Sequence, residues 1–232
     1  MQFSFFTPTL KVHKQRNLLR KTDYRLSSYS VRGLGISIVM LVLSLYLGEY
    51  YEQHPVAAII FVLGVVLTNI FRAYYLVRFD ILYSRGPTRW RNIFFTLSLI
   101  HAAWWGILLA AITYSSGIKN EVPLLWFYSI AFISSCSHVF SPYTRFYLLY
   151  ISLVLIPCSV VAILSFNALE SIYGLIMLLL FVLLKRQGEI IGSAYWSRLQ
   201  AIYDLTQRAY ALEAEKITSE SSLSNKDTLF MN

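Results

Sequence analysis

The third apolar segment of the chain carries a histidine near its middle, together with one hydroxyl and two indole side chains. These residues stand at positions i, i+3, i+6 and i+7, on one side of a helix: Ser98, His101, Trp104 and Trp105. A neutral imidazole at this depth could hydrogen-bond a ligand, or report pH if its pKa were moved into range. The same imidazole could instead join two membrane helices by a hydrogen bond worth about 1 kcal/mol. Both interpretations remain open at the level of sequence.

Polar side chains also occur in the second and fourth apolar segments. In the second, Thr68, Asn69 and Arg72 share a helix face. Ionisable groups inside a membrane usually face the bundle interior or an aqueous cavity, although Arg72 lies near the end of its segment and could extend to the lipid headgroups. In the fourth, Ser134 and His138 share a face, a pattern that also suits close helix packing.

Together these side chains predict a candidate ligand site inside the membrane. His101, His138 and Arg72 are expected to line one cavity. The full candidate set is His101, Trp104, Trp105, Arg72, Asn69, Ser134 and His138.

The residues show no set suited to catalysis. The chain has no glycine-rich phosphate loop, no ATP-binding pattern and no carboxylate pair inside an apolar segment. Its two cysteines, Cys136 and Cys158, lie in apolar segments, so neither a disulfide framework nor a zinc site is expected. We therefore expect no catalytic residues, no metal and no cofactor in this chain.

The composition is that of a membrane protein. Of 232 residues, 56% are hydrophobic and 14% are charged, whereas soluble domains contain about 25% charged residues. The net charge of +8 does not indicate nucleic-acid binding, because the basic residues form no face with interleaved aromatics. The lipid bilayer is therefore the expected environment, and nucleic acid is excluded as a partner.

Six apolar segments are long enough to cross a bilayer, which requires roughly 20 residues. They are expected near residues 32–47, 56–77, 93–113, 122–140, 146–164 and 168–184. The predicted fold class is all-α: a polytopic bundle of six transmembrane helices, with the last helix extending into a cytoplasmic signalling helix or coiled coil. A basic cytoplasmic leader is expected over residues 1–31, the six-helix domain over 32–184 and a cytoplasmic linker helix over 185–232.

Charge asymmetry between the loops predicts the orientation. One set of loops holds five arginines: Arg78, Arg85, Arg89, Arg91 and Arg145. The other set holds only Lys119 among basic residues. The positive-inside rule therefore places both termini in the cytoplasm of a multi-pass membrane protein. The outer connections are too short for a folded domain, so a stimulus would act within the membrane or at its surface.

The polar tail carries apolar residues at heptad spacing: Tyr195, Ile202, Leu205, Ala209 and Leu212. Arg198 and Lys216 interrupt the same seam. This pattern predicts a short parallel coiled coil and hence a homodimer, and a solvated single helix is the alternative.

Two resemblances add a function to this architecture. The ending, residues 225–232, resembles the entry to the dimerisation helix of bacterial sensor histidine kinases, with Leu229 and Phe230 in swapped order and no phosphoacceptor histidine before Asn232. The six spans also resemble the six-span input modules of hybrid histidine kinases and some diguanylate cyclases. The shared features are Arg89-Trp90-Arg91, Trp105-Gly106, Ser141-Pro142 and Tyr195-Trp196.

The resemblance implies a signal-sensing module whose parent protein is an ATP-dependent histidine kinase. ATP and Mg²⁺ would be needed only by domains downstream of Asn232, which would also meet a response regulator. By architectural analogy, the stimulus would be a small molecule of hydrophobic or quorum-sensing type, or one borne by the membrane. The alternatives are the input module of a diguanylate cyclase and, from another class, a small transporter or scaffold complete at Asn232.

Overall fold

A computed structural model describes residues 16–47, 50–117, 122–165 and 167–230, nearly all of them helical. The helices are α1 (Arg16–Leu47), α2 (Tyr50–Gln53), α3 (Pro55–Val77), α4 (Phe79–Arg85), α5 (Pro87–Ser116), α6 (Val122–Phe140), α7 (Thr144–Leu164) and α8 (Ala168–Phe230). These ranges contain no strand. The chain forms two compact units, Met1–Ser193 and Ala194–Asn232.

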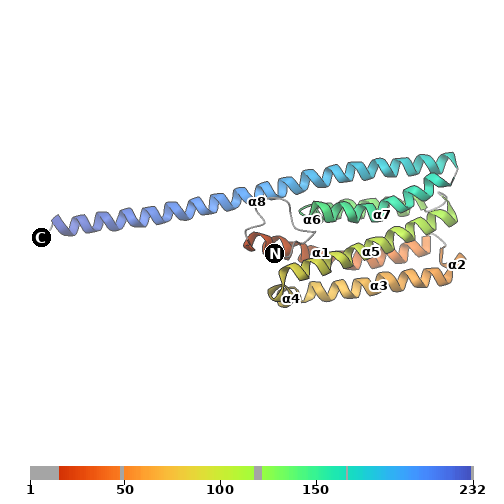
Figure 1. The fold of residues 1–232 in the computed structure, drawn as a ribbon, viewed down its shortest axis with the longest axis horizontal. Coiled ribbons are helices and arrows are strands. Elements are labelled where there is room, and N and C mark those ends of the chain that lie inside the picture. The colour runs from red at the N-terminus through yellow and green to blue at the C-terminus, as the bar shows by residue number, and fades with distance from the viewer. Residues whose placement is uncertain (1–15, 48–49, 118–121, 166, 231–232) are drawn as a thin grey trace. The chain divides into compact units, whose positions relative to one another are not determined.

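Within these described ranges, six helices are long and apolar enough to cross a membrane: α1, α3, α5, α6, α7 and α8. The predicted class, an all-α membrane bundle of six spans, is therefore confirmed. Within the first unit, α1, α3, α5, α6 and α7 run side by side, with α4 at one end and α2 at the other (Figure 1).

The first helix differs from its prediction. It begins at Arg16 rather than near residue 32, so residues 16–31 belong to the bundle and are not a separate leader. The physical reason is a face that the helix buries, made of four polar residues and one leucine: Thr22, Asp23, Ser27, Ser30 and Leu26. Residues 1–15 of the predicted leader lie outside the described residues.

Helix α5 is the centre of the first unit, because it packs on α3, α4, α6 and α7. Its buried side includes an aromatic row in which the Trp90 and Phe94 rings stack at 5.3 Å between centroids. Phe95 stacks on Phe146 of α7 at 4.1 Å. This row fixes α5 against α7 at the end of the unit that carries α4.

A glycine sets how closely α5 and α7 cross. A Cβ atom at Gly106 would lie 1.9 Å from the carbonyl oxygen of Leu153, so no side chain fits without moving the backbone. We expect Gly106→Ala to destabilise the bundle by about 1–3 kcal/mol, because overpacking forces the helices apart. The unfolding midpoint of purified protein in detergent measures this effect.

Gly35→Ala is the matched control for Gly106→Ala, because a Cβ atom at Gly35 of α1 meets nothing within 4 Å. This variant should be neutral or slightly stabilised, since alanine favours helix more than glycine does. Equal effects of the two substitutions would contradict the observed crossing.

Candidate functional site

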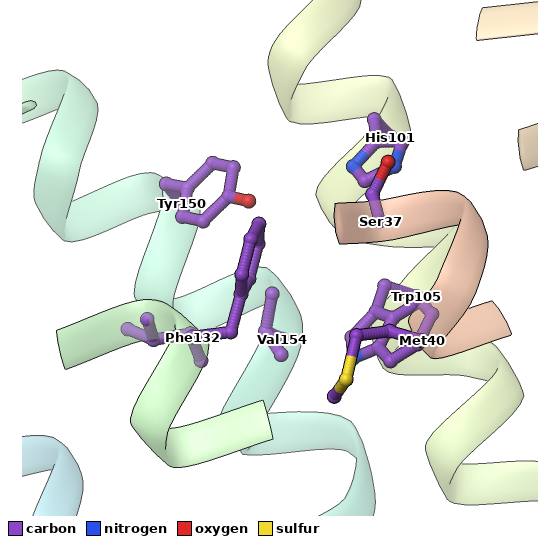
Figure 2. A pocket seen from close by; sticks show the side chains of 8 residues that line it. Ser37, Met40, His101, Trp105, Phe132, Tyr150 and Val154 are labelled. Atoms are coloured by element: carbon purple, nitrogen blue, oxygen red, sulfur yellow. The ribbon is translucent and has the colours of Figure 1, made fainter. Parts of the chain in front are cut away.

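A small cavity lies inside the first unit between α1, α5, α6 and α7 (Figure 2). Its lining residues are Ser37, Met40, His101, Trp105, Phe132, Ile133, Tyr150 and Val154. The cavity volume is ≈ 10 Å³, which is about the space that one water molecule needs. Most of the lining is apolar, and the polar groups come from three different helices.

A chain of hydrogen bonds reaches this cavity from α3. Arg72 Nη1 donates to Asn69 Oδ1 at 3.3 Å, and Asn69 Nδ2 donates to Ser37 Oγ at 2.9 Å. The Ser37 hydroxyl in turn donates to the carbonyl oxygen of Leu34 at 2.8 Å. The Asn69 amide therefore joins the guanidinium of Arg72 to Ser37, which is part of the cavity wall.

His101 faces the cavity without a hydrogen-bond partner. The side chain is 2% exposed, and neither Nδ1 nor Nε2 is bonded within the part of the chain that the structure describes. Figure 2 shows the imidazole beside the Ser37 side chain, with the Tyr150 ring on the opposite wall. A buried polar group left unsatisfied costs free energy, so this histidine is not explained by a helix-to-helix hydrogen bond.

Arg72 is also buried, with 5% of its surface exposed. The alternative that it extends to the lipid headgroups is therefore wrong for this conformation. Its guanidinium lies 6.0 Å from the centroid of the Phe94 ring and acts electrostatically on His101 and Tyr150. Its Nε atom has no partner, and no ion pair joins it to a carboxylate of the described residues.

The two tryptophans of the predicted site have different surroundings. Trp105 lines the cavity with its ring, while its indole N–H donates to Ser129 Oγ at 3.1 Å. Trp104 packs between α3 and α5, where its ring meets Phe61 at 5.9 Å and leaves no space for a Cβ atom at Gly64. Trp104 therefore serves helix packing and does not line the cavity.

The predicted residues of α6 do not join this cavity. His138 is exposed, because the inward face of α6 is made by Ile133, Ser137 and Phe140. Ser134 is half-buried, and its carbonyl oxygen accepts a hydrogen bond from Ser137 Oγ at 2.6 Å. The expectation that His138 lines one cavity with His101 and Arg72 is wrong.

A second buried polar cluster was missed from sequence. Asp23 of α1 is 0% exposed and binds Arg91 of α5 through two hydrogen bonds, Nη2 to Oδ2 at 2.5 Å and Nε to Oδ1 at 3.2 Å. Tyr83 of α4 donates to Oδ2 at 2.8 Å, and Tyr143, between α6 and α7, donates to Oδ1. Four separate segments of the chain thus meet on one carboxylate.

The two phenols are held in their protonated form. Burial and the nearby Asp23 carboxylate both raise the pKa of Tyr83 and of Tyr143 above the usual range. Both hydroxyls therefore remain hydrogen-bond donors to Asp23 at neutral pH.

The sequence pattern alone does not predict that Asp23 and Arg91 are buried together. Asp23 falls within the basic leader expected over residues 1–31, and Arg91 is one of the five arginines counted in the loops to predict the orientation. Arg91 is instead 2% exposed inside the bundle, so it does not belong to that count. The available signal was the spacing of Thr22, Leu26 and Ser30, which repeats every four residues as a buried helix face does.

A larger open cleft of ≈ 930 Å³ lies at the end of the first unit that carries α2. Its polar lining includes His54, Thr113, Ser115 and Glu170. The sequence did not predict this cleft. The lengths of the connecting segments at this end do not show whether the helix ends leave a space between them. Over the described ranges, no group of three or more His, Cys, Asp or Glu residues is placed to hold a metal ion.

Comparison of the chain with protein-family models, with curated proteins and with solved structures finds no match. Fold and site therefore define the class. The chain is a multi-pass α-helical membrane protein whose bundle buries one satisfied charge cluster and one unsatisfied polar cavity.

Proposed function

We propose that the chain is the transmembrane input module of a sensor histidine kinase. A small-molecule or membrane-borne stimulus acts inside the bundle, and α8 passes its effect to a cytoplasmic output domain. The observation that carries this proposal is the continuity of α8, in which one helix holds both the sixth apolar span and the polar tail. A continuous helix can transmit a shift or rotation that a flexible linker would absorb.

Contacts between α7 and the first part of α8 link the cavity to this helix. Tyr150 of α7 lines the cavity, and Tyr147 lies one turn before it. The Tyr147 hydroxyl donates to the carbonyl oxygen of Leu184 at 3.2 Å, and its ring fills the space that a Cβ atom at Gly188 would need. A change at Tyr150 that moves α7 would therefore also displace α8 through the contacts of Tyr147.

The second unit exposes apolar side chains along the predicted heptad seam. Ile202, Leu205 and Leu212 are 58%, 64% and 66% exposed, and Ala209 is also exposed. Tyr195, the first position of the seam, is half-buried. A second copy of the same helix would cover these side chains, so homodimerisation through α8 is part of the proposal.

Cysteine crosslinking in membranes tests the seam. We expect Ile202→Cys and Leu205→Cys to trap covalent dimers on mild oxidation, because core positions of a parallel coiled coil face their own copies. Gln207→Cys, on the opposite side of the helix, is the control and should crosslink weakly. Equal yields at all three positions, or none at the core positions, would contradict a dimer formed through this face.

The output domain is tested by reading the coding sequence past Asn232. A Ser/Thr-His-Glu box directly downstream supports the kinase, which would then need ATP, Mg²⁺ and a response regulator. A GGDEF-type domain at that place would instead make the chain the input module of a diguanylate cyclase. A stop codon would remove the output and leave a transporter or scaffold, for which substrate uptake into vesicles is the next measurement.

A further inference from the structure

The buried charge of Arg72 has no counter-charge among the residues that the structure describes. An arginine keeps its proton in proteins, so burial cannot neutralise it as it can neutralise a lysine or a histidine. Its neighbours are the neutral amide of Asn69 and the face of the Phe94 ring. These groups solvate the guanidinium only in part, because its Nε atom remains without a partner.

Among the described residues, the ion pair of Arg91 and Asp23 shows what a satisfied buried charge looks like in the same protein. Arg91 is held by a bidentate carboxylate, and two tyrosine hydroxyls complete the hydrogen bonds of that carboxylate. Arg72 lies in a comparably dry environment and lacks such a group. The difference points to a ligand that supplies the missing negative charge.

The cavity offers further contacts for such a ligand, and its Ser37 wall is linked to Arg72 through Asn69. Both nitrogens of His101 are unbonded, and the imidazole forms part of the cavity wall. The Tyr150 side chain forms the opposite wall (Figure 2). An imidazole N–H and a phenol O–H are hydrogen-bond donors suited to an anion, and the guanidinium of Arg72, joined to Ser37 through Asn69, adds its charge.

We propose that the cavity between His101, Ser37 and Tyr150 binds a small monovalent anionic group as the counter-ion of Arg72. The volume of ≈ 10 Å³ limits the guest to about the size of one water molecule, so only a small anion or the head of a longer molecule fits. The surrounding walls are apolar: Met40, Phe132, Ile133 and Val154. Two sources share this chemistry, namely a free halide and the carboxylate of an amphiphile.

Binding of the anion does not depend on the proposed signalling role. Its identification as the stimulus does rest on that role, because an anion drawing His101 toward Tyr150 would act on α7 next to its contact with α8. Measuring the unfolding temperature at increasing anion concentration tests anion binding alone. If no anion binds, the sensing proposal still stands, and it is tested separately by measuring whether α8 moves.

The experiment is a thermal unfolding titration of the full chain in dodecyl maltoside at constant ionic strength. Sodium gluconate sets the baseline, because its hydroxylated chain does not suit the apolar walls around the cavity. Chloride and octanoate replace it in separate series, and octanol serves as the uncharged equivalent of octanoate. A ligand that binds only the folded state raises the unfolding midpoint progressively with its concentration.

We expect a saturable rise of the midpoint in chloride, in octanoate or in both, and none in octanol. A rise in chloride, alone or together with octanoate, assigns a free anion, and a rise in octanoate alone assigns an amphiphile carboxylate. Arg72→Met should weaken the apparent affinity at least roughly tenfold, the loss of one charge-assisted contact. Arg72→Lys should retain part of it, and Arg85→Gln, which removes an exposed arginine, should leave it unchanged.

No rise with either anion in the wild-type protein would overturn the proposal and leave the cavity to water. A rise with octanol equal to that with octanoate would overturn it too, because apolar filling would then explain the effect. An equal rise in Arg72→Met would exclude Arg72 as the charge that is neutralised. The titrations of the wild-type protein show whether it binds an anion, even if a variant fails to fold.

Discussion

Asp23→Ala is expected to destabilise the bundle strongly. The change leaves Arg91 charged, 2% exposed and without its partner, and it removes the acceptor of two tyrosine hydroxyls. Breaking a buried ion pair from one side costs about 3–5 kcal/mol. Urea unfolding in dodecyl maltoside micelles, followed by tryptophan fluorescence, measures the change in free energy of unfolding.

Asp80→Ala provides the control for Asp23→Ala. Asp80 lies 3.7 Å from Arg20 in an ion pair whose side chains, Arg20 and Asp80, are 65% and 74% exposed. Exposed pairs contribute at most about 1 kcal/mol, so this variant should unfold close to the wild type. If Asp23→Ala were as stable as Asp80→Ala, the four-segment cluster would not hold the bundle together.

Arg72→Met is expected to act in the opposite direction, although it also removes a buried charge. In a gluconate medium Arg72 has no counter-ion, so the substitution exchanges an uncompensated charge for an apolar side chain. Replacing even a complete buried ion pair by apolar groups is often neutral or stabilising, by about 1–4 kcal/mol, and Arg72→Met leaves no unpaired charge behind. The same urea unfolding measurement applies, and the sign of the change is the result that matters.

Arg91→Met is the matched comparison for Arg72→Met, because both remove a buried arginine from the bundle. It should destabilise, since it leaves Asp23 as an unpaired carboxylate. Destabilisation of similar size in both variants would mean that Arg72 has a compensating partner in the protein itself. That outcome would also remove the premise of the anion site.

Most of the membrane-spanning helices could be predicted from the sequence, because the thickness of the bilayer sets the length of the apolar segments that cross it. Five of the six expected spans, from residue 56 onwards, coincide closely with α3, α5, α6, α7 and the start of α8. The exception is α1, whose first half is polar enough to escape a hydropathy criterion. Those residues are helical because their polar side chains are satisfied by partners far along the chain, such as Arg91 for Asp23.

The residues of the candidate site could be predicted from the sequence only in part. Periodicity correctly placed His101 and Trp105 on one face, since both line the cavity. It could not separate Trp104, which lies on the same side of α5 but meets α3, nor show that His138 points away from the bundle. Those outcomes depend on which helices are neighbours, and neighbour relations among membrane helices are set by close packing at positions such as Gly64 and Gly106.

The most direct test of the sensing proposal measures whether α8 responds to the cavity. A spin label at Gln207 of each copy, outside the predicted seam, reports the distance between two α8 helices in a dimer held in nanodiscs. We expect His101→Ala to shift this distance distribution, whereas Ile107→Ala, at an exposed position of the same helix α5, should not. Identical distributions in the wild type and both variants would contradict transmission from the cavity to α8.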